Sequence, residues 1–301
     1  MKILNIGSLN LDYTYTVPHF VNSGETLASL SREVHCGGKG LNQSIALAKA
    51  GAQVYHAGCI GSEGSMLKSM LSESGVDVSL VSEVEAATGH AIIQVDASGQ
   101  NCIIIFGGAN NSIGKTDVDR YLSHFDAGDI LLVQNETSCV PYAIEQAAKK
   151  GMFVALNPSP ISTELIGSPV LEHVNLFILN EIEGHELSGE LEPENICAAM
   201  RKKYPQSRIM LTLGSAGCIY FDGETFVRQG IYPVTAVDTT GAGDTFAGYF
   251  LGCMARGETI ERTLSISSMA SAIAVSRPGA ASSIPGVPEV CRALEKTQAV
   301  S

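Results

Sequence analysis

The sequence lacks an excess of positive charge. Its 301 residues include 31 Asp and Glu against 19 Lys and Arg, which gives a formal net charge of -12. Nucleic-acid-binding proteins neutralise several phosphates with Lys and Arg, and anionic membrane surfaces attract clusters of the same side chains. We therefore expect no nucleic acid and no membrane surface among the partners of this chain.

Closely spaced cysteines are also missing. The eight cysteines are at least 21 residues apart, so the sequence contains neither a zinc ribbon nor a Cys-x-x-Cys redox motif. The seven histidines show no metal-ligand spacing. No Gly-x-Ser-x-Gly elbow occurs, so a serine hydrolase has no support.

Long apolar runs are absent as well. No stretch of about 18 uncharged apolar residues occurs, so we predict no membrane-spanning helix. Residues 1–7 contain an apolar run too short for an export signal, and we predict a first strand there. We therefore expect a cytoplasmic protein whose cysteines are small buried side chains in a reducing compartment.

The composition is that of a globular chain, with 45% apolar and 17% charged residues. A chain of this length buries roughly three-quarters of its unfolded surface and needs no disulfides to form a core. We find no linker, internal repeat or low-complexity tract. The sequence therefore predicts a single domain over residues 1–301.

Short apolar runs alternate with helical stretches from about residue 129 onward. Four such runs, each typical of a strand buried on both faces, occupy residues 129–134, 152–156, 174–179 and 208–213. Strand and helix in repetition predict an α/β fold with a mostly parallel central sheet flanked by helices. Two long apolar helices are predicted at 242–255 and 260–276.

Four other segments alternate polar and apolar residues with period two, which predicts strands with one wet face. They occupy residues 11–17, 29–36, 90–95 and 101–106, the last two around a turn at 96–99. Because they come from two separate insertions, we predict a small sheet that forms a lid from about 11–36 and 90–106. Ordinary surface hairpins are the alternative.

Polar residues follow the four apolar runs. Ligands of open parallel sheets bind at the carboxyl ends of the strands, so these residues predict a shared polar cleft. They are Gln134, Asn135 and Glu136, then Asn157, then Asn180 and Glu183, then Gly214 and Ser215.

The segment 238–246 reads Asp-Thr-Thr-Gly-Ala-Gly-Asp-Thr-Phe and leads into a long apolar helix. Glycines let backbone N–H groups face a ligand, and the positive end of the helix dipole favours an anion. Asp244 would repel that anion unless it takes a proton from a hydroxyl nucleophile beside it. The alternative is that Asp244 merely stabilises the helix N-terminus.

Two further segments have the composition of ligand-binding turns. Residues 36–43, Cys-Gly-Gly-Lys-Gly-Leu-Asn-Gln, open an apolar helix and suit an anion or a polyol, although turn chemistry alone also explains them. Residues 7–12, Gly-Ser-Leu-Asn-Leu-Asp, place Asn10 and Asp12 on one side of an extended chain, where they could grip sugar hydroxyls or cap a turn. Residues 109–116 fit a permissive phosphate-loop pattern, but the loop interior lacks glycine and we expect no nucleotide there.

Together these motifs resemble those of the ribokinase-like sugar kinases. The resemblance rests on Gly-Gly-Lys-Gly-Leu-Asn-Gln near residue 40 and Asp-Thr-Thr-Gly-Ala-Gly-Asp-Thr-Phe near 240. Gly-Ser-Leu-Asn-Leu-Asp at 7–12, Leu-Asn-Pro-Ser-Pro at 156–160, Asn-Glu-Ile-Glu at 180–183 and Thr-Leu-Gly-Ser-Ala-Gly at 212–217 match as well. It covers essentially the whole chain.

The resemblance implies transfer of the ATP γ-phosphoryl group to the hydroxymethyl of a pentose, D-ribose to D-ribose 5-phosphate. It implies a β-sheet lid that closes on the sugar and contributes to a homodimer. Asp244 would be the general base, and the amides of Gly241, Ala242 and Gly243 would form an anion hole. The residues implied to hold the sugar are Asn10, Asp12, Gly38, Lys39, Asn42, Glu136 and Asp244.

The same resemblance implies the cofactors ATP, Mg²⁺ and a monovalent cation, normally K⁺. The nucleotide would contact Asn180, Thr212, Gly214, Ser215, Gly217 and Gly243. Asn180 and Glu183 would bind Mg²⁺ through water. The monovalent cation would lie near Asp238, Thr240, Ala274, Arg277, Gly279 and Ser283, mostly on backbone carbonyls; Pro278 departs from the family pattern.

The sugar is less firmly implied than the reaction. Asn135 is polar where the family commonly has an apolar residue, whereas Asn10 favours ribose over deoxyribose because it could pair with a 2-hydroxyl. The alternatives are a kinase of the same fold for deoxyribose, a fructose-type sugar or an adenosine-type nucleoside, or a non-catalytic sugar or nucleotide sensor.

Overall fold

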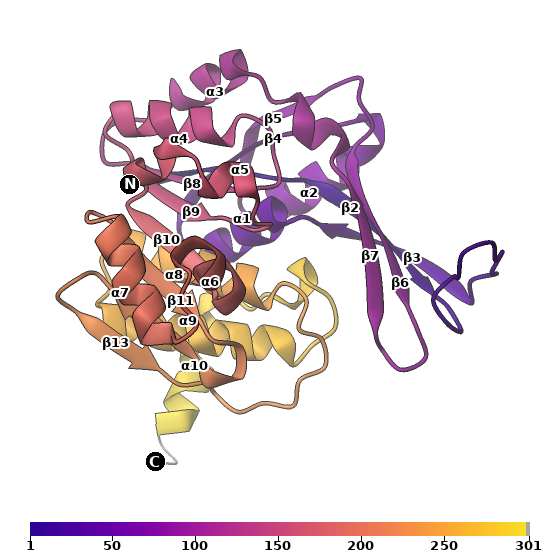
Figure 1. Cartoon of the computed structure of the whole chain (residues 1–301). Helices are drawn as coiled ribbons and strands as arrows, with labels where there is room; N and C mark the ends of the chain where they lie inside the picture. Colours follow the sequence, from indigo (N-terminus) through magenta and orange to yellow (C-terminus); the bar gives the residue numbers. More distant parts are fainter. Residues whose placement is uncertain (299–301) are drawn as a thin grey trace.

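The computed structural model describes residues 1–298 and is built around a nine-stranded sheet (Figure 1). The strand order is β13-β12-β11-β10-β9-β8-β1-β4-β5, and all neighbours run parallel except the edge pairs β11·β12 and β12·β13. The strands are β1 (Lys2–Ile6), β4 (Gln53–Ile60), β5 (Asp77–Glu83), β8 (Ile130–Gln134), β9 (Phe153–Asn157), β10 (Leu176–Asn180), β11 (Arg208–Thr212), β12 (Cys218–Phe221) and β13 (Phe226–Gln229). This confirms the predicted α/β fold with a mostly parallel sheet.

Helices cover both faces of the sheet, each over its own apolar core. One face carries α1 (Lys39–Lys49), α2 (Ser65–Glu73), α8 (Ala242–Ala255), α9 (Ile260–Val275) and α10 (Val287–Gln298). The other carries α3 (Lys115–Leu122), α4 (Val140–Lys149), α5 (Thr163–Ile166), α6 (Glu181–Ser188) and α7 (Pro193–Lys203). The helices predicted at 242–255 and 260–276 are therefore α8 and α9.

Glycine in α8 lets this helix lie close against α1. A Cβ at Gly248 would overlap the Cβ of Ala46 and come within 2.9 Å of the Gln43 carbonyl, and a Cβ at Gly252 would lie 2.8 Å from the Cβ of Ala50. Glycine costs a helix about 1 kcal/mol relative to alanine, and the close approach of the two helices accounts for its presence. It matters for the site because α1 and α8 both begin there.

A second sheet of four strands, in the order β3-β2-β6-β7, projects from the main body (Figure 1). Its strands are β2 (Asn10–Thr16), β3 (Ser31–Gly37), β6 (Gly89–Val95) and β7 (Asn101–Phe106). The pair β2·β6 is parallel and the other two pairs are antiparallel. The period-two segments thus form one small sheet and not separate hairpins.

Residues 1–298 also contain five short 3₁₀ turns. They are η1 (Ser62–Gly64), η2 (Gly108–Ser112), η3 (Pro169–His173), η4 (Gly214–Ala216) and η5 (Ala281–Ser283). Among residues 1–298, no helix has both the length and the apolar character needed to cross a membrane.

Candidate active site

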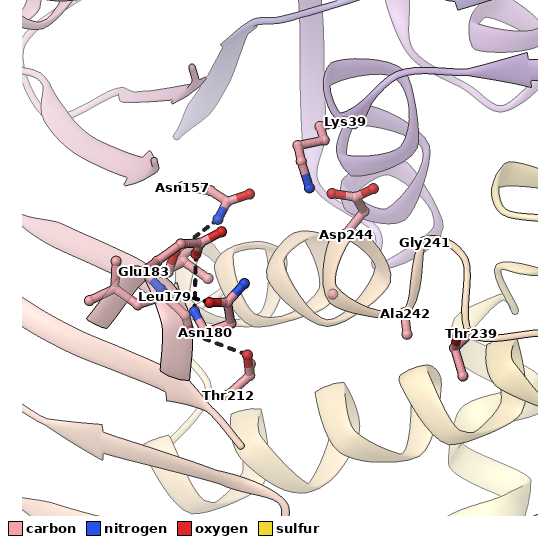
Figure 2. Close-up of a pocket in the computed structure, with 12 residues that line it drawn as sticks. Lys39, Asn157, Leu179, Asn180, Glu183, Thr212, Thr239, Gly241, Ala242 and Asp244 are labelled. Carbon is pink, nitrogen blue, oxygen red and sulfur yellow. Dashed lines mark hydrogen bonds between the residues drawn. The ribbon is translucent and has the colours of Figure 1, made fainter. Parts of the chain in front are cut away.

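A pocket of about 250 Å³ opens at the carboxyl ends of the central strands (Figure 2). Strands β9, β10 and β11 contribute its floor, and the N-termini of α1 and α8 form the opposite wall. Of the polar residues predicted at the strand ends, Asn157, Asn180 and Glu183 line this pocket, whereas those that follow β8 and β11 do not. Its lining residues are Lys39, Asn157, Ile178, Leu179, Asn180, Glu183, Thr212, Thr239, Gly241, Ala242, Gly243 and Asp244.

Asp244 lies in the first turn of α8 and is only 7% exposed. Its two carboxylate oxygens accept hydrogen bonds from separate side chains of α1. The Asn42 Nδ2 donates to Oδ2 at 3.0 Å, and the Gln43 Nε2 donates to Oδ1 at 2.9 Å. An acid that served only the helix dipole would not need two buried donors from another helix, so the structure gives this carboxylate a fixed orientation at the pocket.

The turn that starts α8 leaves backbone N–H groups without partners. Gly241 adopts φ 73°, a left-handed conformation that glycine favours, and it caps the helix without a side-chain hydrogen bond. The Ala242 amide donates to the Thr239 carbonyl at 3.2 Å, whereas within residues 1–298 the amides of Gly241 and Gly243 have no acceptor. A Cβ at Gly243 would meet open space. Two free donors beside a positive helix end fit an anion.

Lys39 is the one positively charged residue of the pocket lining, and its side chain lies beside Asp244 (Figure 2). The negative charge of Asp244 raises the pKa of Lys39, although burial alone would lower it, and Glu136 and Glu183 add to the rise. The lining carries two carboxylates, Glu183 and Asp244, against this one cation. A bound polyanion therefore needs further positive charge or backbone donors.

The N-terminus of α1 is already occupied by other residues of the chain. The Lys39 amide donates to the Glu136 carboxylate at 3.1 Å, and the Gly40 amide donates to the Ser8 hydroxyl at 3.2 Å. Ser8 in turn donates to the same Glu136 carboxylate, and the Leu41 amide donates to the Ser8 carbonyl at 3.0 Å. These first amides of α1 are thus not free for an anion, and Glu136 itself is the anion at this helix end.

Glycines near Lys39 permit this arrangement. A Cβ at Gly40 would overlap the backbone of Gly7 and Ser8. Gly38 has φ 95°, and a Cβ at this position would lie 3.0 Å from the Ser8 carbonyl oxygen. The glycines of this motif therefore serve the close approach of two chain segments. They bring Glu136 and Lys39 together at the N-terminus of α1.

Asn10 and Asp12 lie at the start of β2, where the small sheet meets the central one. The Asn10 Oδ1 accepts from the Asn110 Nδ2 at 2.8 Å, and the Asn110 Oδ1 accepts from the Leu9 amide at 2.9 Å. Asn110 was not predicted to act here; it lies in the segment 109–116. In that segment Lys115 lies over the Tyr142 ring at 5.1 Å, so the structure gives the phosphate-loop interpretation no support.

The carboxyl groups of Asp12 and Glu136 both have raised pKa values. Burial, and after it the nearby charge of Glu136, raise the pKa of Asp12 to about 6 against the opposing effect of His35. Burial also raises the pKa of Glu136, against the hydrogen bond from Ser8 and the charge of Lys39. Two partly buried carboxylates near each other suit a ligand rich in hydroxyl donors.

Asn180 and Glu183 form a capping box at the start of α6. The Glu183 amide donates to the Asn180 Oδ1 at 2.8 Å, and the Asn180 amide donates to the Glu183 carboxylate at 3.0 Å. Thr212 donates to the Leu179 carbonyl at 3.1 Å. Gly214, Ser215 and Gly217 follow β11 but do not line the pocket.

The residues suggested for a monovalent cation come together beside the α8 turn. Asp238 accepts hydrogen bonds from the amides of Thr240 and Gly279, both at 2.9 Å. Burial would raise the pKa of Asp238, but these hydrogen bonds outweigh it and lower the pKa. The Ala274 carbonyl accepts from the Arg277 amide at 3.1 Å, and Ser283 donates to the Ala280 carbonyl.

Several backbone carbonyl oxygens of this loop accept no hydrogen bond from the described residues. Within residues 1–298, no amide donates to the carbonyls of Asp238, Thr240, Arg277 or Gly279. The Arg277 side chain forms an ion pair with Glu289 and does not enter the loop. No group of three His, Cys, Asp or Glu residues in the described part of the chain forms a metal cluster.

Comparison with known proteins identifies the family. The model of the pfkB family carbohydrate kinases matches residues 1–286. The chain belongs to the pfkB family of carbohydrate kinases. This kinase is therefore a phosphotransferase with an alcohol group as acceptor.

Individual relatives match this kinase over nearly its whole length. The ribokinase of Haemophilus influenzae is 34% identical over 300 residues, covering 96% of this chain and 97% of the relative. The deoxyribokinase of Salmonella typhimurium is 30% identical over 297 residues, covering 95% and 96%. The structure of Arabidopsis thaliana ribokinase complexed with ribose and ATP has a TM-score of 0.85 at 30% identity and covers 97% of this chain and 98% of that chain.

Proposed function

We propose that this kinase is a ribokinase that transfers the γ-phosphoryl group of ATP to the hydroxymethyl of D-ribose, giving D-ribose 5-phosphate. The observation that carries the proposal is Asp244, held by two donors beside the partner-free amides of Gly241 and Gly243. The similarity to ribokinases, one of them solved with ribose and ATP, supports the choice of sugar and nucleotide.

In the proposed reaction, Asp244 removes the proton of the sugar hydroxymethyl as its oxygen attacks the γ-phosphorus. Backbone N–H groups at the start of α8 stabilise the charge that develops on the phosphoryl oxygens. The Gly241 and Gly243 amides are free for this task, whereas the Ala242 amide has to give up a long hydrogen bond to Thr239. Lys39 adds a positive side chain on the sugar side of the same pocket.

The sugar subsite that we propose lies between the small sheet and the start of α1. Asp12 and Glu136 accept hydrogen bonds from sugar hydroxyls, and Gly38, Lys39 and Asn42 line the remaining side. The Oδ1 of Asn42 is buried without a partner in the described residues, so it is an acceptor that a sugar hydroxyl can satisfy. Asn10 contacts the 2-hydroxyl in this proposal.

Asn135, which departs from the family pattern, has a structural partner away from the sugar. Its Nδ2 donates to the Pro160 carbonyl at 2.7 Å and to the Ser162 hydroxyl at 3.2 Å. These bonds tie the end of β8 to the loop after β9. The polar residue therefore gives no reason to choose a sugar other than ribose.

ATP binds with Mg²⁺ in this proposal. The pocket lining is net negative, so the metal has to offset the phosphate charge. One Glu183 carboxylate oxygen and the Asn180 Oδ1 already serve the capping box, which leaves the second Glu183 oxygen to accept from a metal-bound water. The oxygen donors thus fit an outer-sphere Mg²⁺ site, and Thr212, Gly214, Ser215 and Gly217 complete the nucleotide side.

A monovalent cation fits the loop formed by residues 238–241 and 277–283. Carbonyl oxygens are ligands that K⁺ accepts, and four carbonyls of this loop, those of Asp238, Thr240, Arg277 and Gly279, have no amide partner within residues 1–298. We propose that the cation positions the Gly241 turn from behind. Ala274 and Ser283 take the outer positions of the same site.

A homodimer through the small sheet is also part of the proposal. The outer strand β7 carries Ile103, Ile104, Ile105 and Phe106, which are 49 to 62% exposed in the single chain. Apolar patches of this kind mark interaction sites. Successive side chains of a strand point to opposite faces, so a second copy packed on one face of the small sheet would bury either Ile103 and Ile105 or Ile104 and Phe106.

Release of ADP over a panel of sugars tests the function. D-ribose is expected to give the highest kcat/KM, with 2-deoxy-D-ribose, fructose and adenosine as competitors. A preference for 2-deoxy-D-ribose would favour the function named for the Salmonella relative. Absence of ADP release with every sugar would favour a non-catalytic sensor.

A further inference from the structure

Gln43 has no role in the reaction described above, although it contacts the proposed base. It follows Asn42 in the first turns of α1 and is completely buried. Both hydrogens of its side-chain amide are used, one by the Asp244 Oδ1 and one by the Asn157 Oδ1, each at 2.9 Å. Gln43 therefore links the base to the end of β9.

The first anchor of the Gln43 amide comes from α1 itself. The Gly40 carbonyl can only accept, so the Asn5 Nδ2 that donates to it at 2.9 Å is fixed as the donor end of Asn5. The Asn5 Oδ1 then accepts from the Gln134 Nε2 at 3.0 Å. The same Nε2 donates to the Gln43 Oε1 at 2.7 Å, which directs the Gln43 NH₂ toward Asp244.

A second anchor, at the end of β9, fixes the same orientation of the Gln43 amide. The Asn157 Nδ2 donates to the Ile178 carbonyl at 2.9 Å, so the Asn157 Oδ1 is the end that faces Gln43. Only the NH₂ of Gln43 can pair with this oxygen. Two backbone carbonyls, on α1 and on β10, thus fix one orientation of the Gln43 amide.

The chain of amides extends into the core. Asn5 also donates to the Ser44 hydroxyl at 2.8 Å, and Ser44 pairs with the His56 Nδ1 at 2.8 Å. Burial lowers the pKa of His56 to about 4, so this ring is neutral at neutral pH. The side chains of Asn5, Gln43, Ser44, His56 and Gln134 are all at most 1% exposed.

We propose that Gln43 is a positioning residue for Asp244 and that the buried amide chain fixes its orientation. The proposal rests on the role of Asp244 in the proposed function. A carboxylate that is held by Gln43 on one oxygen and by Asn42 on the other cannot rotate freely about its Cβ–Cγ bond. The oxygen that attacks the sugar proton therefore meets the hydroxymethyl in a single geometry, which general-base catalysis requires.

A purely structural role for Gln43 predicts something different. In that case its loss would lower stability and leave the chemical step unchanged. A positioning role predicts a loss of kcat with little change in KM, since the Gln43 side chain is completely buried and does not line the pocket. It also predicts that the loss disappears once Asp244 is gone, because both residues act through the same group.

The kinetic test uses Gln43→Met, which keeps the length and removes the donor. We expect kcat to fall about 10- to 100-fold with KM values within about threefold of wild type. The control Gln53→Met changes an exposed glutamine and should keep wild-type kcat. In an Asp244→Asn background, Gln43→Met should cause no further fall in kcat. Wild-type kcat in the single variant, or an equal further fall in the double variant, overturns the proposal.

A second measurement needs no activity and no Gln43 variant. Side-chain amide signals of Gln43, assigned by NMR in the wild-type protein, should exchange slowly with solvent and shift on Asp244→Asn. Rapid exchange with solvent, or Gln43 amide chemical shifts that do not change on Asp244→Asn, would overturn the proposal. If the wild-type protein phosphorylates no sugar, the proposed function fails, and this measurement alone decides whether Gln43 holds Asp244.

Discussion

Replacement of Asp12 by asparagine is expected to stabilise the ligand-free protein above pH 6 and to weaken sugar binding. Within residues 1–298 no side chain or amide donates a hydrogen bond to the Asp12 carboxylate, and Gly37 packs directly against it. Burial and the charge of Glu136 raise the pKa of Asp12 from 3.8 to about 6. Asparagine keeps the shape and removes the buried charge.

The pKa values give both the sign and the size of the effect. The folded protein holds the Asp12 proton more tightly than the unfolded chain does, so the folded state loses stability as the pH rises from about 4 to about 6. A difference of about 2 pH units at about 1.4 kcal/mol each amounts to about 3 kcal/mol. The asparagine variant avoids this loss, so its advantage is near zero at pH 4 and reaches about 3 kcal/mol above pH 6.

Urea denaturation followed by circular dichroism between pH 4 and pH 8 measures this difference. Asp126→Asn, which changes an exposed carboxylate, is the matched control and should show no such pH-dependent gain. A variant that is less stable than wild type at pH 8, or a stability difference that does not change with pH, would refute the reasoning. The KM for D-ribose should rise at least tenfold in Asp12→Asn, because a charged acceptor is lost.

Three further predictions concern helix packing, cations and a loop. Gly248→Ala should lower Tm, because the added methyl group would press on Ala46. Such overpacking costs about 1–3 kcal/mol, whereas the gain in helix propensity is about 1 kcal/mol. An unchanged Tm would show that α1 and α8 can separate without cost. Removal of Mg²⁺ with a chelator should abolish ADP release, and exchange of K⁺ for choline should lower kcat; equal rates in both salts would exclude a role for the cation loop. Lys115→Ala should leave ATP affinity within about twofold of wild type, as calorimetry can measure, since this residue lies over Tyr142 and away from the pocket.

Local sequence patterns were sufficient for the elements that have one dominant periodicity. The continuous apolar runs became β8 to β11, and the alternating segments became the four strands of the small sheet. Strand β4, with the sequence Gln-Val-Tyr-His-Ala-Gly-Cys-Ile, mixes small and polar residues and gave no such pattern. Its buried His56 forms a hydrogen bond with Ser44, which lies 12 residues earlier in the chain. A local sequence pattern does not predict this pairing.

The candidate site shows the same division. Asp244 and the glycines of 241–243 were predictable because a turn of small residues before an apolar helix has a direct chemical meaning. The actual partners of Lys39 and Gly40 were not, since Glu136 and Ser8 reach the start of α1 only through the order of strands in the sheet. Gln43 was missed as a contact of the base. Three consecutive polar residues, 42–44, inside an otherwise apolar helix were the signal that could have revealed it.

The central claim is that Asp244 acts as the base for phosphoryl transfer to a sugar hydroxymethyl. One measurement tests it most directly: the product formed from D-ribose and ATP, identified by ³¹P NMR, in the wild-type protein and in Asp244→Asn. We predict D-ribose 5-phosphate from the wild-type protein and a rate lower by about 10²- to 10⁴-fold in the variant, with ATP affinity retained. A variant that forms the same product at a near-normal rate, or a phosphate on another oxygen of the sugar, would contradict the account.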